Sequence, residues 1–358
     1  MTGVEYNRRL ERIPVYPAAR TWDYEGELVE LASNETPWGP PPPVVAALQS
    51  QIERLNRYPD PSKSLLRQRI ADRYDLPAAG VAVGNGSCEI LMAAADALLE
   101  PGAEVVYAWP SFSMYPHLAA QSGATAIEVP LDADARHDLE AMAREVTAAT
   151  RMLVVCNPNN PTGTALDVGA IDAFVAALPR HVCVIVDEAY VEFSTLQDPD
   201  DSRDLVARHP NLVLLRTFSK IYGLCGLRAG YALGSERFRA AVDRVRQPFS
   251  VNTLAQAAAA EAIRHQDEVA KRVEATAIER AWFEGELDRR GLESSDTEAN
   301  FAWVALGERD EAEIVDGLAR RGVIVRAGAA LGSEGHLRVT YGTREQNRCL
   351  FAALDELL

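Results

Sequence analysis

One lysine of this sequence stands in a setting that suits covalent chemistry. Lys220 is preceded by the hydroxyl residues Thr217 and Ser219. These follow the apolar run Leu212–Leu215, which is typical of a strand buried on both faces. An amine held out of bulk water can lose its proton and attack a carbonyl group. Arg228 follows in the same segment, and hydroxyls with an arginine are what a phosphate group requires. The segment predicts a nucleophilic lysine beside an anion site, with an ordinary surface turn as the alternative.

Further polar and aromatic groups come directly after other predicted strands. They are Gly86, Ser87 and Cys88 in a glycine-containing turn before a helix, then Phe112, Asn157, Asp187 and Tyr190. Ligands of parallel sheets bind beyond the carboxyl ends of the strands, so these groups should meet at one edge. An acid there is costly unless it faces a cation, the glycine turn suits an anion, and an aromatic can stack on a flat ring. A capped turn and a core aromatic are the alternatives for Gly86 and Phe112.

Pyridoxal phosphate is the ligand class that uses all of these groups together. It offers an aldehyde to a lysine, a ring nitrogen to a carboxylate, a ring oxygen to donors, a flat face to an aromatic residue and a phosphate to an anion site. Each signal is weak alone. Their joint occurrence at successive strand ends predicts this cofactor.

Seven short apolar runs, separated mostly by helical segments, position these groups. The runs are Val81–Val83, Glu104–Ala108, Thr125–Val129, Met152–Cys156, Val182–Val186, Leu212–Leu215 and Gly230–Leu233. The pattern predicts an α/β fold with a mostly parallel seven-stranded sheet covered by helices. We expect an N-terminal arm at 1–33, a large cofactor-binding domain at 34–250 and a small α+β C-terminal domain at 251–358.

Composition narrows the class of partner. The chain of 358 residues carries a formal charge of −16, which argues against binding nucleic acid or an anionic membrane surface. Its five cysteines are scattered, and neither they nor the histidines show metal-ligand spacing, which favours a reducing cytoplasm and no metal. We see no signal peptide and no apolar run long enough to span a membrane, so we expect a cytoplasmic protein.

With these motifs in place, the sequence resembles the fold-type I pyridoxal-phosphate aminotransferases, and more narrowly the histidinol-phosphate aminotransferases. The resemblance covers nearly the whole chain. The segments that carry it are 33–37 (SNETP), 57–60 (RYPD), 84–87 (GNGS), 157–163 (NPNNPTG), 187–190 (DEAY), 219–220 (SK), 226–230 (GLRAG) and 337–344 (LRVTYGTR). Where many relatives have an acid in the glycine turn, this chain has Cys88, and where many have alanine it has Cys225.

The resemblance implies a role for each matching residue. Lys220 would hold the cofactor covalently and then move the proton between substrate and cofactor. Asp187 would keep the ring nitrogen protonated, and Asn157 and Tyr190 would donate to the ring oxygen. Phe112 would stack on the ring. The phosphate would be held by Gly86, Ser87, Cys88, Thr217, Ser219 and Arg228.

The resemblance also implies substrates and an assembly. Tyr58 would reach the cofactor phosphate of a neighbouring subunit, so we expect a homodimer with shared active sites. Arg338 would bind the acidic group of the substrate, assisted by Arg326 and Tyr16, with Asn157 also near the substrate. The implied reaction moves an amino group between glutamate/2-oxoglutarate and imidazole acetol phosphate/histidinol phosphate, a step of histidine biosynthesis.

Several other functions fit the same sequence. The same machinery could act on phenylalanine and tyrosine. The same fold could serve a threonine-phosphate decarboxylase or a lyase, and a cofactor-binding regulator without turnover is a further class. A nucleotide-binding Rossmann protein is disfavoured, because the glycine turn at 84–87 lacks the second half of that fingerprint.

Overall fold

The computed structural model describes residues 3–13, 24 and 26–358. Its α-helices are α1 (Pro42–Ile52), α2 (Ser64–Tyr74), α3 (Ser87–Leu98), α4 (Met114–Ser122), α5 (Leu139–Arg144), α6 (Val168–Ala177), α7 (Arg203–Arg208), α8 (Glu236–Val245), α9 (Thr253–Ala262), α10 (Gln266–Arg289), α11 (Glu311–Arg320) and α12 (Arg344–Asp355). Short 3₁₀ turns are η1 (Arg8–Arg12), η2 (Ala78–Gly80), η3 (Val191–Phe193), η4 (Cys225–Leu227) and η5 (Ala329–Leu331).

The larger sheet contains seven strands in the order β2-β8-β7-β6-β5-β3-β4. They are β2 (Val81–Gly84), β3 (Glu104–Trp109), β4 (Thr125–Pro130), β5 (Thr150–Cys156), β6 (Cys183–Asp187), β7 (Leu212–Thr217) and β8 (Gly230–Leu233). The strands from β7 through β4 pair in parallel, whereas β8 pairs antiparallel with both β7 and β2. The predicted α/β fold with a mostly parallel seven-stranded sheet is confirmed.

Both faces of this sheet are buried, which explains its apolar strand sequences. Neighbouring side chains point to opposite faces, so Val105 and Val154 join one core while Val106 and Val155 join the other. Helices α3, α4 and α8 pack on the first face. Helices α2, α5, α6 and α9 contribute to the core on the second face. Polar groups at the strand ends are therefore held by a rigid, fully packed scaffold.

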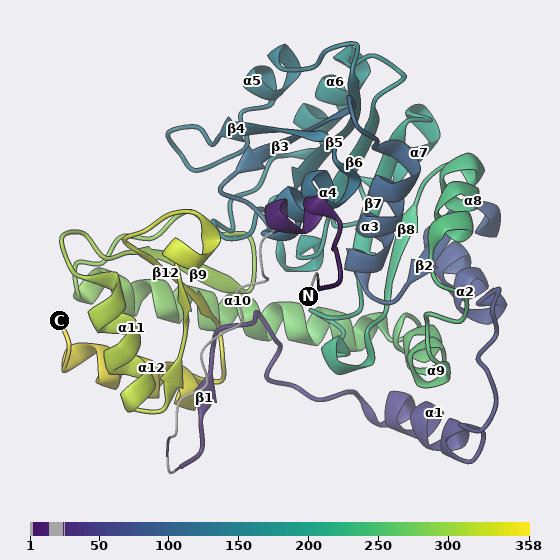
Figure 1. The fold of residues 1–358 in the computed structure, drawn as a ribbon. Coiled ribbons are helices and arrows are strands. Elements are labelled where there is room, and N and C mark those ends of the chain that lie inside the picture. The colour runs from purple at the N-terminus through teal and green to yellow at the C-terminus, as the bar shows by residue number, and fades with distance from the viewer. Residues whose placement is uncertain (1–2, 14–23, 25) are drawn as a thin grey trace.

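A smaller antiparallel sheet has the strand order β11-β12-β9 (Figure 1). A separate hydrophobic core, distinct from the two cores of the larger sheet, surrounds it. The strands of this sheet are β9 (Phe301–Ala305), β11 (Arg326–Ala327) and β12 (His336–Thr340). Helices α11 and α12 pack on this core. Near the N-terminus, β1 (Val29–Glu30) pairs in parallel with β10 (Val323–Ile324) and so attaches the first part of the chain to this region.

Helix α10 runs past both regions (Figure 1). Its residue Val269 belongs to one of the cores of the larger sheet, as do the buried alanines of α9. Phe283 and Leu287 belong instead to the core of the smaller sheet. The boundary that we expect at 250/251 falls before α9. The packing instead supports a boundary inside α10, so that α9 goes with the larger region.

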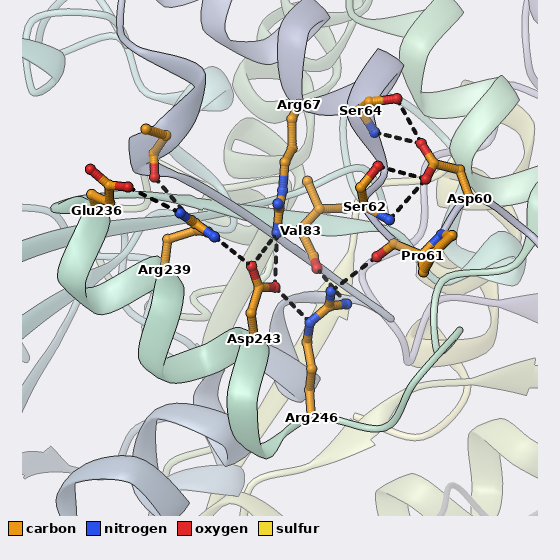
Figure 2. A network of polar contacts seen from close by, with 11 residues as sticks. Asp60, Pro61, Ser62, Ser64, Arg67, Val83, Glu236, Arg239, Asp243 and Arg246 are labelled. Carbon is orange, nitrogen blue, oxygen red and sulfur yellow. Dashed lines mark hydrogen bonds and ion pairs between the residues drawn. The ribbon is translucent and has the colours of Figure 1, made fainter.

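A polar network joins α2 to α8 and fixes the turn before α2 (Figure 2). Asp243 accepts hydrogen bonds from Arg67 at 2.7 and 2.8 Å and from Arg246 at 2.8 Å. In the turn, Asp60 accepts from the backbone and hydroxyl groups of Ser62 and Ser64, at 2.6 to 2.8 Å. Burial alone would raise the pKa of Asp60, but these hydrogen bonds outweigh it and hold the pKa well below its usual range.

Candidate active site

A cavity of about 430 Å³ lies beyond the carboxyl ends of β5, β6 and β7, and residues of the smaller region close it. It brings together most of the predicted site residues: Ser87, Cys88, Phe112, Asp187, Tyr190, Thr217, Ser219, Lys220, Arg228, Arg326 and Arg338. Gly86, Tyr58 and Asn157 do not line it. Tyr16 lies outside the described residues. Side chains as far apart in the sequence as Ser87 and Arg338 therefore face one space.

Lys220 lies in the connection between β7 and β8, beside Tyr190. Its Nζ donates a hydrogen bond to the Ser33 carbonyl oxygen at 2.9 Å and lies 5.6 Å from the centre of the Tyr190 ring. Burial, followed by the positive charge of Arg338, lowers the pKa of Lys220 to about 8. About a tenth of the amine is therefore neutral at pH 7, which is far more than for an exposed lysine, and the neutral form is what a nucleophile or base requires.

Asp187 ends β6 at the floor of the cavity, and only 3% of it is exposed. Its Oδ2 accepts a hydrogen bond from the Tyr115 hydroxyl at 3.0 Å, while its Oδ1 has no hydrogen-bond partner among the described residues. Burial raises the pKa of Asp187 to about 6. A buried carboxylate with one unsatisfied oxygen fits a cationic ligand atom. Our sequence analysis did not single out Tyr115.

An anion site lies where the N-terminus of α3 meets Arg228. Gly86 caps this helix with a φ of +78°, and a Cβ there would lie 2.6 Å from Arg228 Nη2. A Cβ on Gly230 would lie 2.3 Å from the Ser87 nitrogen, so both positions need glycine. Arg228 Nη1 also donates to Ser219 Oγ at 3.4 Å. Helix-terminal N–H groups, a hydroxyl and a guanidinium together suit a phosphate.

Two further residues shape this part of the cavity. Thr217 Oγ1 accepts a hydrogen bond from the Ser219 nitrogen at 3.0 Å and so fixes the turn that leads to Lys220. The side chain of Cys88 lines the cavity, and burial followed by the charge of Asp187 raises the pKa of the Cys88 thiol. Cys88 therefore remains a neutral thiol at neutral pH.

Tyr190 is held by Asn34, a residue to which our sequence analysis assigned no role. Asn34 Nδ2 donates to the Tyr190 hydroxyl oxygen at 3.0 Å. Asn34 also contacts the smaller region, because its backbone nitrogen donates to Thr340 Oγ1 at 2.9 Å and its carbonyl accepts from Asn300 Nδ2 at 3.2 Å. Burial raises the pKa of Tyr190, so its hydroxyl stays protonated and remains a donor.

The structure separates two asparagines of the 157–163 motif. Both polar atoms of the Asn157 amide bond the backbone of Leu166, with Nδ2 donating to its carbonyl at 3.0 Å and Oδ1 accepting from its nitrogen at 2.8 Å. Asn160 lines the cavity instead, and its Oδ1 accepts from Arg338. The amide that faces the cavity is therefore that of Asn160, three residues after Asn157.

Two buried arginines face the cavity from the smaller sheet. Arg326 on β11 lies directly opposite Arg338 on β12. Arg338 Nη1 donates to Asn160 Oδ1, and its Nη2 donates to the Ala32 carbonyl oxygen, each at 2.6 Å. Both side chains line the cavity with less than a tenth of their surface exposed. Two guanidinium groups on one wall suit a carboxylate or phosphate of a substrate.

Tyr58 lies elsewhere on the surface. It is 82% exposed, and its ring stacks on Phe249 with 4.7 Å between the ring centres and an interplanar angle of 26°. The two rings line a separate shallow hollow formed by residues around 55–59 and 247–253.

Among the described residues, no group of three or more histidine, cysteine or acidic side chains is placed to hold a metal ion. No helix in the same ranges is both long and apolar enough to cross a bilayer.

Comparison with known proteins first defines the class. The structure superimposes on histidinol-phosphate aminotransferase from Sinorhizobium meliloti, solved in complex with pyridoxal-5'-phosphate, with a TM-score of 0.88 and 26% identity over 99% of this chain and 98% of that one. Its fold is thus that of the fold-type I aminotransferases.

Sequence comparison then gives the family. The model of the family "Aminotransferase class I and II" matches residues 26–354, so the chain belongs to this family. It is 42% identical to histidinol-phosphate aminotransferase from Moorella thermoacetica, over 93% of this chain and 86% of that protein. It is 43% identical to an aromatic amino acid aminotransferase from Thermobifida fusca, over 94% and 93%.

Proposed function

We propose that this chain is a pyridoxal-phosphate-dependent aminotransferase acting on glutamate/2-oxoglutarate and imidazole acetol phosphate/histidinol phosphate. The observation that carries the proposal is the cavity itself. It combines an amine with a lowered pKa, a buried carboxylate with one unsatisfied oxygen, an anion site and a pair of arginines from the smaller sheet. The family membership and the names of two sets of relatives support the same reaction class.

The residues present fit the proposed cofactor. Asp187 Oδ1 is available to the ring nitrogen, and the site at Arg228, Ser219 and the start of α3 suits the phosphate. Tyr190 and Asn160 are the donors for the ring oxygen, and Phe112 is the aromatic on the cavity wall for the ring face. When bound, pyridoxal phosphate supplies an aldehyde for an amine and a ring that accepts electron density from the substrate carbon.

Lys220 is the proposed acid and base of the reaction. Its pKa of about 8 leaves part of the amine neutral near neutral pH, so Nζ can take up the proton that leaves the substrate Cα and hold it as an ammonium group for the next transfer. The hydrogen bond to the Ser33 carbonyl restricts where Nζ can lie. Arg338 therefore serves twice, by binding an acidic substrate and by lowering the pKa of the lysine.

The arginine pair supports substrates that carry an anionic group away from the reacting carbon. Arg326 and Arg338 offer bidentate donors to the carboxylate of glutamate and to the phosphate of histidinol phosphate in turn. Phenylalanine and tyrosine are the alternative substrates. They are favoured by the relative from Thermobifida fusca and by the apolar wall that Leu331 and Phe112 form in the same cavity.

A substrate panel tests the function. The purified protein should be yellow, and borohydride should abolish that absorbance. Single-turnover reactions with histidinol phosphate, glutamate, phenylalanine and tyrosine should show histidinol phosphate reacting faster than either aromatic amino acid. A colourless protein would remove the cofactor assignment, and faster reaction of phenylalanine would move the assignment to aromatic amino acids.

We also propose that the enzyme is a cytoplasmic homodimer in which Tyr58 reaches the partner's cofactor phosphate. The exposed Tyr58–Phe249 stack supports the dimer, and the five free cysteines support a reducing compartment. Heterodimers provide the test. One subunit with Lys220→Ala beside a wild-type subunit should keep about half the activity, because one site stays intact. Adding Tyr58→Phe to the variant subunit should impair that remaining site. Unchanged activity would contradict the role of Tyr58.

A further inference from the structure

The segment 328–335 joins the two strands that carry the cavity arginines. It begins after β11, which bears Arg326, and ends before β12, which bears Arg338. Within it, the turn η5 ends at Leu331, whose side chain lines the cavity and is only 4% exposed. Any displacement of this segment therefore changes the cavity wall beside both arginines.

The carboxylate of Glu311 holds this segment by accepting hydrogen bonds from backbone N–H groups at both of its ends. Glu311 is the first residue of α11 and is 7% exposed. Its Oε1 accepts from the Ala329 nitrogen at 3.0 Å, and its Oε2 accepts from the nitrogens of Gly335 and His336 at 2.7 and 3.2 Å. One carboxylate thus bonds both ends of the segment with charge-assisted hydrogen bonds, which are the strong kind. Glu311 does not itself line the cavity.

The opposite side of the segment meets the larger sheet. Gly332 has a φ of +92°, and a Cβ on it would lie 2.6 Å from ring atoms of Trp109, the last residue of β3. Within the segment, the Gly328 nitrogen donates to the His336 carbonyl at 2.8 Å and its carbonyl accepts from the Leu331 nitrogen at 2.8 Å. The segment is thus fixed between Glu311 and Trp109, with Leu331 directed by both contacts.

We propose that Glu311 is a positioning residue for the substrate: it holds the segment 328–335 so that Leu331 forms the apolar wall for the ring of a ring-bearing substrate. The proposal rests on the proposed function. A ring, whether imidazole or phenyl, packs on a leucine side chain, whereas glutamate has no ring to place there. Glu311 therefore acts on the ring-bearing substrate more than on glutamate.

The variant Glu311→Gln tests this role. Glutamine keeps the shape and one acceptor oxygen, but it places an amide N–H against the backbone N–H groups. We expect its KM to rise about tenfold for the preferred ring-bearing substrate, histidinol phosphate or phenylalanine, with kcat within threefold of wild type. KM for glutamate and the yellow absorbance should stay within threefold of wild type. Leu331→Ala should show the same split, and it tests the wall directly if Glu311→Gln fails to fold.

Asp310→Ala is the matched control on the same helix. Asp310 caps α11 by accepting from the Glu313 nitrogen at 3.0 Å, and among the described residues it makes no hydrogen bond or ion pair with the segment. This variant should lower Tm while leaving the KM ratio of the two substrates unchanged. Unchanged KM for the ring-bearing substrate in both Glu311→Gln and Leu331→Ala, or an equal rise in Asp310→Ala, would overturn the role of Glu311. A wild-type protein that turns over no substrate of the panel would instead overturn the proposed function.

Discussion

Two pairs of adjacent residues at the carboxyl ends of β6 and β7 show how one sheet serves two purposes. Asp187 and Thr217 face the cavity, whereas their sequence neighbours Glu188 and Arg216 are buried beside Tyr74. Successive side chains of a strand point to opposite faces, so a one-residue step separates the two environments. Both environments contain buried charged side chains. The two environments differ in how many of the hydrogen bonds of these side chains are made within the chain.

On the Glu188 side, each of the three guanidinium nitrogens of Arg216 has a hydrogen-bond partner. Arg216 Nε donates to Glu188 Oε2 at 2.8 Å, Nη1 donates to the Tyr74 hydroxyl at 3.0 Å, and Nη2 donates to the Pro199 carbonyl and to Ser202 Oγ. On the cavity side, by contrast, Asp187 keeps an unsatisfied oxygen. A buried network whose donors are paired stabilises a fold, and a buried oxygen that faces a cavity can accept a bond from a ligand. The open oxygen of Asp187 and the cavity in front of it therefore favour the Asp187 side as the site.

The largest effect should come from the cavity lysine. Lys220→Ala should lower kcat by about 10⁴-fold or more, because it removes both the nucleophile and the acid and base. Borohydride treatment should also no longer attach the cofactor covalently to the chain. Steady-state rates and absorbance spectra provide the measurement, and near-wild-type activity would contradict the central role of this amine.

Removing the ion-pair partner of Glu188 should lower stability rather than activity. Arg216→Met would leave Glu188 buried and unpaired, which costs about 3–5 kcal/mol in the free energy of unfolding. Urea unfolding measures this cost. The double variant Arg216→Met/Glu188→Gln should recover part of it, while kcat per folded molecule stays within about threefold. If Arg216→Met is as stable as wild type, the ion pair between Arg216 and Glu188 does not stabilise the fold.

The substrate arginine should give a smaller, selective effect. Arg338→Ala should raise KM for acidic substrates about 30–100-fold, because charge-assisted bidentate bonds are lost. Cofactor affinity should change by less than threefold, which equilibrium titration of the cofactor-free protein can measure. Arg326→Ala is the comparison, with a weaker effect of the same sign. Equal loss of cofactor affinity would contradict the assignment to substrate.

The smallest effect concerns pH and Asp187. Its pKa rises from 3.8 to about 6 on burial, so the folded protein binds more protons than the unfolded chain between these values. Stability therefore falls as pH rises from about 4 to 6 and stays low above that window. Without cofactor, Asp187→Asn should be more stable than wild type at pH 8 by about 1–2 kcal/mol, with the gap closing near pH 4. With cofactor the order should reverse. Thermal unfolding across pH gives the measurement, and a gap that widens toward pH 4 would contradict the sign.

The sheet could be predicted because its strands are buried on both faces and therefore read as unbroken apolar runs. The residues after each strand could be predicted because a parallel sheet gathers them at one edge. The choice between Asn157 and Asn160 could not, because identical amides differ only in the path of the loop that carries them. Tyr115 and Asn34 escaped detection because each acts through one contact with a residue distant in sequence.

A domain boundary inside α10 could also not be predicted from the sequence. Helical periodicity shows which face of α10 is apolar, but it does not show that Val269 and Phe283 pack into different cores. We therefore propose that the smaller domain begins within this helix, rather than at residue 251.

Asn34 connects the phenol of Tyr190 to the smaller sheet on the opposite side of the cavity. Its amide bonds Tyr190, while its main chain bonds Thr340, two residues beyond Arg338 on the same strand. A hydrogen bond depends on both its length and its angle, so a shift of β12 would change the bonds that Asn34 makes. The strand that carries Arg338 and the phenol that lies beside Lys220 are therefore joined through a single residue.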